Sequence, residues 1–431
     1  MRILDVSPRV TVPPERGSST RTFNLLRHLS RDHEIRQFSQ RRLRPPIEEH
    51  RTGEVRVNAS YVEYRYRNRL AALVGEIAER SWLRAPVLSG ASLALTQPAG
   101  LDCLLAWADV VLVEFPWQLR YCRARRRDIP VVLAAHNVEA AKFLSYAESV
   151  GVATRRTAWT RYIERTEARA VAAADLVLTV SAADRSDLIE RYGVEPARVV
   201  EIPNGADTER YLPVPREAKA KLKSELGLPD RPTVVFAGAD NGPNWAGLDW
   251  VRRLAARAPE LTFLALGLVS RPRRDGNLIA PGFVPDFERY LQAADAALCP
   301  IEFGGGTKLK LLESLAAGLP TVAFAETLHG LELRDGVHVL VAERTEESLA
   351  RQLMRLRQDA DLAGGLGRSA RAFVEERHDW RAIAAKLDVT VRELAETAVA
   401  REPFRPRRLP ARAALEAALG ARASGRPDAT G

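Results

Sequence analysis

Residues 304–323 read GGGTKLKLLESLAAGLPTVA, a triple glycine followed by a helical pattern from Thr307 to Ala317 and then by a new apolar segment. A short apolar segment that ends on Pro300 precedes the glycines. Glycines let the backbone approach an anion closely, and a helix N-terminus directs free amides and a positive dipole end at it. The stretch therefore predicts a strand, an anion-binding turn and a helix within an α/β domain.

The side chains around this turn favour a nucleotide diphosphate as the anion. We expect Thr307 to cap the helix, and Lys308 and Lys310 add positive charge. Glu313 lies nearly two turns into the helix, where a carboxylate could accept hydrogen bonds from a ribose diol. The order of residues matches neither a Walker A loop nor the dinucleotide-binding fingerprint. An ordinary helix start after a flexible turn remains the alternative interpretation.

Composition limits the classes to which the chain can belong. Its 431 residues suggest two to three domains, and 46% hydrophobic with 28% charged residues is typical of a globular protein. The net charge of +9 favours anionic partners, but no nucleic-acid-binding motif accompanies it. Three scattered cysteines predict neither a disulfide framework nor a metal site. We expect a cytoplasmic protein without a signal peptide or a transmembrane helix.

Strand patterns alternate with helical patterns along most of the chain, which predicts parallel sheets covered by helices on both faces. The expected strands of the first half are 2–6, 35–38, 55–66, 110–114, 131–135, 176–180 and 199–202. Those of the second half are 233–237, 261–266, 277–279, 296–300, 321–324 and 337–341. The main helical patterns are 20–30, 69–95, 139–174, 286–293, 307–317 and 348–398.

A turn at 203–205 and a proline-containing stretch at 211–215 mark a boundary, which predicts domains at 1–205 and 206–377. Residues 401–431 are rich in Arg, Pro, Ala and Gly, and we expect a mostly disordered basic tail there. Ligands of open α/β sheets bind at the carboxyl ends of the strands. Several candidate site residues follow predicted strand ends and are expected to meet in one cleft: Gly17, His136, the 239–245 loop and 304–307.

Taken in order, the motifs of the chain resemble those of GT-B-fold glycosyltransferases, in particular the large retaining family 4. The resemblance covers about residues 1–398 and rests on these segments: 7–24, HNVE at 136–139, IPNGAD at 202–207, FAG at 236–238 with Pro243-Asn244, and KLLESLAAGLP at 310–320. The family often carries two glutamates with seven residues between them. Glu313 matches the second, whereas Gly305 occupies the first position. The usual Arg and Lys after the first donor-domain strand are also missing; Asn241, Asn244 and Trp245 stand there.

The resemblance implies two Rossmann-like domains that face each other across a cleft, with a C-terminal helix at about 378–400 that packs back on the N-terminal, acceptor-side domain. It implies transfer of a sugar, with retention, from a nucleotide-diphosphate sugar to a hydroxyl acceptor, without a metal or a further cofactor. His136 would be catalytic, and Gly17 and Ser18 would belong to the acceptor-side loop. The donor would be bound by Gly304, Gly305, Gly306, Thr307, Lys308, Lys310, Glu313 and Asn244.

Two alternatives share this architecture. A nucleotide-sugar 2-epimerase would convert the donor without an acceptor, and a non-catalytic homologue would bind a nucleotide sugar without turnover. The missing glutamate and the missing Arg and Lys keep the second alternative open.

A basic, aromatic segment gives a further expectation, that of docking on an anionic membrane. Arginines cluster there beside aromatic residues: Arg120, Arg123, Arg125, Arg126 and Arg127 with Phe115, Trp117 and Tyr121. A solvated helix face is the alternative interpretation of this cluster. If the cluster does dock, a lipid-linked acceptor is expected, as in cell-envelope or exopolysaccharide assembly.

Overall fold

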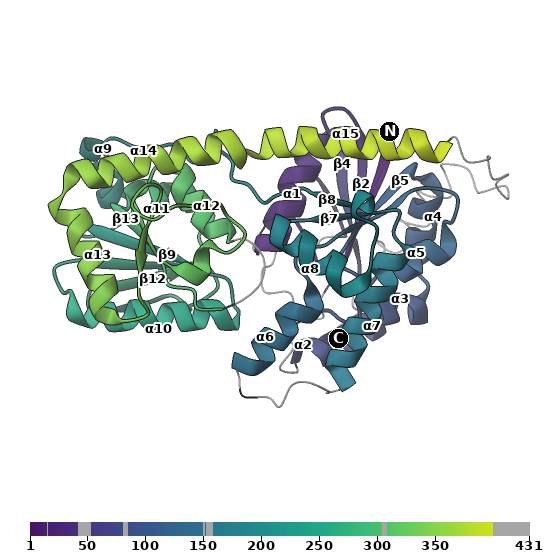
Figure 1. Ribbon diagram of the computed structural model, residues 1–431, viewed down its shortest axis with the longest axis horizontal. Helices are drawn as coiled ribbons and strands as arrows, with labels where there is room; N and C mark the ends of the chain where they lie inside the picture. Colours follow the sequence, from purple (N-terminus) through teal and green to yellow (C-terminus); the bar gives the residue numbers. More distant parts are fainter. Residues whose placement is uncertain are drawn as a thin grey trace, which may run out of the picture.

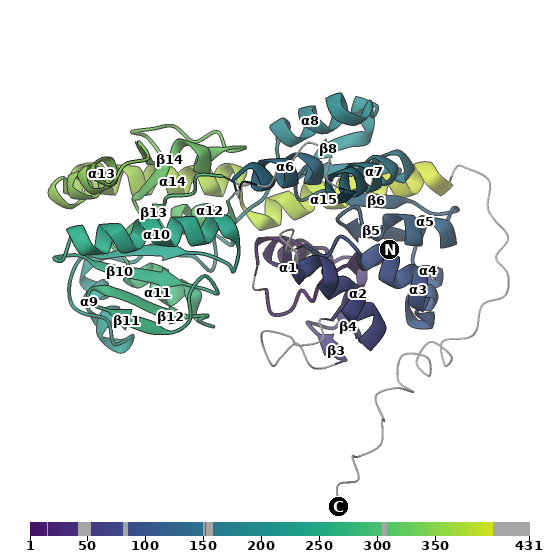
Figure 2. The same ribbon diagram turned by 90° about the horizontal axis from the view of Figure 1, so that it is seen from below.

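The structure is a computed structural model that describes residues 1–14, 16–41, 53–80, 85–149, 151, 158–303 and 308–399. Its described part is built on two sheets, one from each half of the chain, and helices flank both (Figures 1 and 2). The predicted alternation of strands and helices is confirmed.

The N-terminal sheet has eight strands in the order β3-β4-β2-β1-β5-β6-β7-β8. All neighbours pair in parallel except β3, which is antiparallel to β4. Its strands are β1 (Arg2–Ser7), β2 (Glu34–Gln40), β3 (Glu54–Arg56), β4 (Tyr61–Tyr66), β5 (Val110–Glu114), β6 (Val131–Ala134), β7 (Leu176–Thr179) and β8 (Val199–Glu201).

The helices between these strands are α1 (Gly17–Leu29), α2 (Arg69–Arg80), α3 (Ser89–Thr96), α4 (Ala99–Trp107), α5 (Leu119–Arg125), α6 (Glu139–Ser149), α7 (Ala158–Ala173) and α8 (Ala182–Tyr192). Each residue of β5 and β6 is buried, as the continuous apolar runs of a doubly covered parallel sheet require.

The C-terminal sheet has seven strands in the order β11-β12-β10-β9-β13-β14-β15, parallel except for the β11–β12 pair. Its strands are β9 (Thr233–Ala237), β10 (Thr262–Leu266), β11 (Arg273–Asp275), β12 (Leu278–Gly282), β13 (Ala296–Cys299), β14 (Thr321–Phe324) and β15 (Leu340–Ala342). The helices of this half are α9 (Arg216–Glu225), α10 (Gly242–Arg257), α11 (Phe287–Ala293), α12 (Leu309–Ala316), α13 (Glu346–Gln358) and α14 (Ala360–Arg377).

The chain returns to its N-terminal half at the end. Helix α15 (Trp380–Val399) packs along α1, where Ile383, Leu387 and Val391 join the apolar cluster that contains Leu25 and Leu29. Figure 1 shows α14 and α15 running in succession past both sheets. The outgoing and returning segments meet where the Ala206 amide donates to the His378 carbonyl at 2.8 Å.

Several predicted boundaries are wrong. Residues 55–66 form a hairpin rather than one strand, because Asn58 accepts hydrogen bonds from the Ser60 and Tyr61 amides and turns the chain. The pattern at 69–95 contains α2 and α3, and the pattern at 139–174 contains α6 and α7. Gly17 and Ser18 lie in the first turn of α1 rather than in the loop before it.

Candidate functional site

A cavity of about 350 Å³ lies between the two halves and is lined by residues of both. It forms at the carboxyl ends of strands, as expected for open α/β sheets. Six predicted site residues line it: Gly17, Ser18, His136, Asn244, Lys308 and Lys310. The structure therefore brings together residues that the sequence places up to about three hundred positions apart.

Two helices begin at this cavity from opposite sides. In α1 the amide of the N-cap residue Arg16 donates to the Ser19 hydroxyl at 2.9 Å, and in α12 the N-cap residue is Lys308. The two starts are close neighbours, because a Cβ atom added to Gly17 would lie 3.4 Å from Cδ1 of Leu309. First-turn amides of a helix are hydrogen-bond donors for an anion, so two helix starts at one cavity suit a negatively charged ligand.

Two further helices reach the cavity with their starts already capped. The Glu167 carboxylate of α7 accepts from the backbone amides of Glu139 and Ala140 at 2.7 and 3.0 Å, which closes the start of α6. Burial raises the pKa of Glu167 to about 7. The Asn241 side chain accepts from the Asn244 amide and caps α10. The starts of α1 and α12 differ from these two in lying beside the lysines of the cavity, Lys308 and Lys310.

Lys308 is the N-cap residue of α12, and its side chain is partly buried at the cavity. Burial lowers its pKa to about 8, which Lys142 reinforces and Asp184 opposes. An ammonium group whose proton is destabilised by burial gains when an anionic ligand arrives. Lys308 is therefore well placed to neutralise a diphosphate.

Lys310 and Glu313 form an ion pair one turn apart on α12. The Lys310 Nζ atom lies 2.7 Å from the Glu313 carboxylate and also 4.3 Å from the ring centre of Phe287. Glu313 is 2% exposed and does not line the cavity. A ribose contact through Glu313 would require Lys310 to release one carboxylate oxygen, and this role stays a prediction.

Asn244 lies in the first turn of α10, and its side-chain amide donates to the Ala239 carbonyl at 3.1 Å. Its Nδ2 group thus fixes the loop after β9. Its side-chain oxygen could accept a hydrogen bond from a ligand in the cavity.

His136 follows β6, and two neighbours hold its ring. Its Nε2 atom is hydrogen-bonded to the carboxylate of Glu114, the last residue of β5. The Phe115 ring stacks on the imidazole, with centroids 4.4 Å apart and planes 18° apart. Phe115 has φ of 69°, a left-handed conformation that is strained for a bulky side chain.

Sequence reasoning did not find Glu114 or the role of Phe115. The signal was present, because Glu114 is a lone carboxylate that ends the apolar run VVLV, and a buried charge needs a partner. The strained backbone of Phe115 leaves no such trace in the sequence.

Some predicted residues cannot be placed. Gly304, Gly305, Gly306 and Thr307 lie outside the described residues, as does the 401–431 tail. Helix α12 begins at Leu309 with Lys308 as its N-cap, two residues later than predicted, and the capping role of Thr307 stays a prediction.

The arginine cluster is mostly engaged within the protein. Arg123 pairs with Asp175, Arg125 with Asp102 at 2.6 Å, and Arg126 with Asp128 at 2.9 Å. The aromatic neighbours Phe115 and Trp117 line the cavity instead of an outer face. The cluster is therefore a weak candidate for a membrane-binding surface. Within the described ranges, no helix has the length and apolar character needed to cross a membrane.

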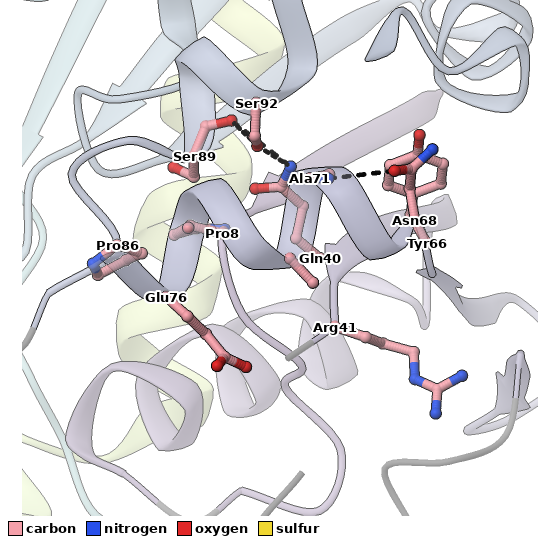
Figure 3. A pocket seen from close by; sticks show the side chains of 12 residues that line it. Pro8, Gln40, Arg41, Tyr66, Asn68, Ala71, Glu76, Pro86, Ser89 and Ser92 are labelled. Atoms are coloured by element: carbon pink, nitrogen blue, oxygen red, sulfur yellow. Dashed lines mark hydrogen bonds between the residues drawn. The ribbon is translucent and has the colours of Figure 1, made fainter. Parts of the chain in front are cut away.

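A second, smaller pocket of about 30 Å³ lies between α2 and the ends of β2 and β4 (Figure 3). Gln40 donates to Ser92 there at 3.0 Å, and Asn68 accepts from the Ala71 amide at 3.1 Å. This volume holds only a few water molecules, so we do not assign it a substrate.

Comparison with family models is consistent with this arrangement. Residues 16–210 match the model described as Glycosyltransferase Family 4, and residues 231–359 match Glycosyl transferases group 1. A D-inositol 3-phosphate glycosyltransferase of Xylanimonas cellulosilytica is 31% identical over 66% of this chain and 72% of its own. The same-named protein of Salinispora arenicola is 30% identical over 59% and 61%. The chain spans about three fifths of the length of the first curated relatives that it matches.

Solved structures share the fold over nearly the whole chain. Sucrose-phosphate synthase from Thermosynechococcus elongatus superposes with a TM-score of 0.71 at 17% identity, covering 92% of this chain and 100% of that one. Anabaena Alr3699/HepE in complex with UDP and glucose gives 0.66 at 16% identity, covering 91% and 100%. At these identities the likeness shows the fold alone, and it confirms the expected GT-B architecture.

Proposed function

Because the chain belongs to the group 1 glycosyltransferases of family 4, we propose that it transfers a sugar, with retention, from a nucleotide-diphosphate sugar to a hydroxyl acceptor. The observation that carries this proposal is the cavity between the two halves, where the starts of α1 and α12 are close neighbours beside Lys308 and Lys310. A departing nucleotide diphosphate develops negative charge, and prearranged amides and ammonium groups stabilise it.

The two sides of the cavity would have different roles in binding the donor and the acceptor. Lys308, Lys310 and the start of α12 would hold the diphosphate, with Asn244 nearby in the same half of the chain. His136 lies across the cavity at the end of β6 and would contact the donor sugar or the acceptor hydroxyl. Gly17 and Ser18 would form the wall that receives the acceptor.

Donor binding is the first test. Thermal shifts would be recorded with UDP-, GDP-, dTDP- and ADP-sugars, beginning with UDP-glucose because HepE was solved with UDP and glucose. A ligand at one hundred times its Kd stabilises the native state by about 2.7 kcal/mol. We expect a shift with one nucleotide class that Lys308→Met loses and the control Lys221→Met, at an exposed lysine of α9, keeps. No shift with any donor would count against the site.

Product analysis then separates the alternatives. Transfer gives a glycoside of the acceptor and a free nucleoside diphosphate, with the anomeric configuration of the donor kept. An epimerised donor without an acceptor would support the 2-epimerase alternative, which the family assignment does not favour. Binding without any turnover would support a non-catalytic homologue.

Peripheral membrane association is the finer part of the proposal, and helix α2 is the better surface for it. Leu70, Leu73 and Ile77 are all at least half exposed and share one helix face by their spacing. The exposed Arg67 and Arg69 lie at the start of the same helix. An apolar stripe beside positive charge suits an anionic bilayer surface, which fits an acceptor in envelope, exopolysaccharide or glycolipid assembly.

Vesicle sedimentation tests this surface. We expect binding to anionic vesicles that falls with salt, and that is lost when Leu70, Leu73 and Ile77 are changed together to Asn. The control Val389→Asn alters an exposed apolar residue of α15 and should bind like the wild type. Equal binding by the triple variant and the control would assign membrane contact to another surface.

A further inference from the structure

A row of buried polar side chains crosses the N-terminal sheet and ends at His136. Strands β4, β2, β1 and β5 are neighbours, and Glu63, Gln37 and Asp5 are register partners across the first three. Glu114 lies on β5 two residues beyond Leu112, the register partner of Asp5. All four are buried, three of them without any exposed surface. Buried polar groups in sheets need hydrogen bonds that satisfy them, and the residues of this row form such bonds with one another and with their neighbours.

The hydrogen bonds of the row point toward Glu114. The Tyr61 hydroxyl donates to Gln37 Oε1 at 2.7 Å, and Gln37 Nε2 donates to Asp5 Oδ1 at 2.8 Å. The other Asp5 oxygen, Oδ2, is buried and has no hydrogen-bond partner among the described residues, and the neighbouring Glu114 carboxyl helps to raise the pKa of Asp5. Two carboxyl groups can bond only when one of them carries a proton.

The directions of the two pKa shifts place that proton on Asp5. Burial and the neighbouring Glu114 raise the pKa of Asp5 well above its usual range. Although burial opposes it, His136 and Asp5 lower the pKa of Glu114. Arg21 adds positive charge nearby, held by the carbonyls of Ile202 and Pro203 at 2.7 Å each.

The far end of the row is neutralised separately. Glu63 accepts from the Arg65 guanidinium at 2.9 Å, from Ser39 at 2.7 Å and from the Thr11 amide at 2.6 Å. These three donors stabilise the Glu63 carboxylate without the proton on Asp5. The ionised carboxylate that remains to direct a neighbour is Glu114.

We propose that Glu114 and Asp5 are positioning residues that fix the His136 imidazole in one tautomer. The protonated Asp5 carboxyl donates a hydrogen bond to Glu114, and Glu114, kept ionised, accepts a hydrogen bond from the Nε2–H of His136. The other ring nitrogen, Nδ1, then carries a lone pair at the cavity, where His136 is part of the lining. Nδ1 can accept a hydrogen bond from a hydroxyl of the acceptor or of the donor sugar.

Phe115 contacts the face of the His136 imidazole ring. Glu114 holds the imidazole by its edge, and the stacked Phe115 ring limits its rotation. This inference rests on the proposed function for its purpose, because a directed Nδ1 matters only if a substrate hydroxyl reaches it. The tautomer itself can be measured without substrate.

The test uses full-length protein labelled with ¹⁵N-histidine. The chain has seven histidines, and the signals lost in His136→Gln identify His136. In the wild type at a pH where the ring is neutral, we expect Nε2 protonated and Nδ1 unprotonated. Glu114→Gln can present either an oxygen or an N–H to Nε2, so we expect mixed tautomers and about a 100-fold lower kcat with little change in KM.

Two further variants keep the test decisive. Asp5→Asn offers an amide N–H to Glu114 in place of the carboxyl proton, so the tautomer should match the wild type. Asp175→Asn is the matched control, a carboxylate at the opposite end of β6 that accepts from the Val131 amide at 2.8 Å, and it should leave the tautomer and kcat unchanged.

Each outcome decides the proposal. An unchanged tautomer in Glu114→Gln, or a changed one in Asp5→Asn, would overturn it, and a folding defect in the first variant leaves the second as the test. If wild-type protein shows the Nε2–H tautomer but no donor shift, the positioning stands while the proposed function fails. If donor binding and turnover are present but the tautomer is mixed, the reverse holds.

Discussion

The imidazole of His136 and the ring of Phe115 are stacked, with their centroids 4.4 Å apart, and Phe115 adopts a strained left-handed backbone to reach this position. Strain of this kind persists where surrounding structure enforces it, and it concentrates at functional sites. The pair joins the ends of β5 and β6 at the cavity wall. It suggests that the orientation of the imidazole, and not only its presence, has a function.

Phe115→Leu should therefore lower turnover more than stability. The aliphatic side chain keeps apolar bulk but cannot stack flat, and the loss of an aromatic pair costs about 1 kcal/mol. We expect kcat to fall by about tenfold for a misoriented general base or hydrogen-bond acceptor, with donor thermal shifts preserved. Equal losses of kcat and donor binding would show that Phe115 shapes the donor pocket instead.

The affinity for a nucleotide sugar should fall as pH rises above about 8. The free protein loses the Lys308 proton near that pH, whereas a bound diphosphate favours the protonated form. Binding is therefore strongest below this pH and weakens by up to about tenfold per pH unit above it. Calorimetric Kd values between pH 6.5 and 9.5 would check this, and Lys308→Met should flatten the profile. A wild-type profile that is already flat would remove Lys308 from the diphosphate site.

Gly17 should tolerate only the smallest side chain. Its added Cβ would meet Leu309 at 3.4 Å, so Gly17→Ala is expected to bind donor normally, whereas Gly17→Leu pushes the starts of α1 and α12 apart. We expect at least about tenfold weaker donor binding for the Leu variant, or about 1.4 kcal/mol. Gly365→Leu on α14, where nothing lies near the added carbon, is the control. Normal binding by Gly17→Leu would show that the contact is dispensable.

Stability should carry a pH-dependent component from Glu167. Its pKa of about 7 exceeds the ordinary 4.5, so the native state binds the extra proton between these values and the free energy of unfolding falls as pH rises through them. The difference corresponds to about 3 kcal/mol. Denaturant unfolding from pH 4 to 8 should show this slope in the wild type and a reduced slope in Glu167→Gln. Parallel curves for the two proteins would place the titration elsewhere.

The sequence predicts most of the fold where a continuous apolar run has turn residues on both sides. The bounds of β5, β9 and β14 agree with the prediction for that reason. The 55–66 hairpin was missed because apolar and polar residues alternate through its turn, and alternation alone does not reveal a reversal. The starts of α1 and α12 were each misplaced by two or three residues, since weak N-cap signals leave helix boundaries poorly defined.

The candidate site was only partly predictable. Residues at strand ends could be placed together because parallel sheets gather those ends on one edge. The Asp5–Glu114 contact could not, because it depends on β1 and β5 being neighbours although about a hundred residues separate them. Pairing order across a sheet is a property of the folded chain.

The chain leaves its first half near Ala206 and returns beside it at Asp379, where the two segments form a bridge. The C-terminal sheet is thus an insertion held by two adjacent peptide crossings, with α15 fastened to α1 beyond them. Because the two chain crossings lie side by side, they form a single hinge between the halves. Rotation of the halves about that line would move the distant cavity walls most and the two crossings least. Truncation of the chain after residue 377 would remove both the returning crossing and α15, and would therefore expose the apolar side of α1.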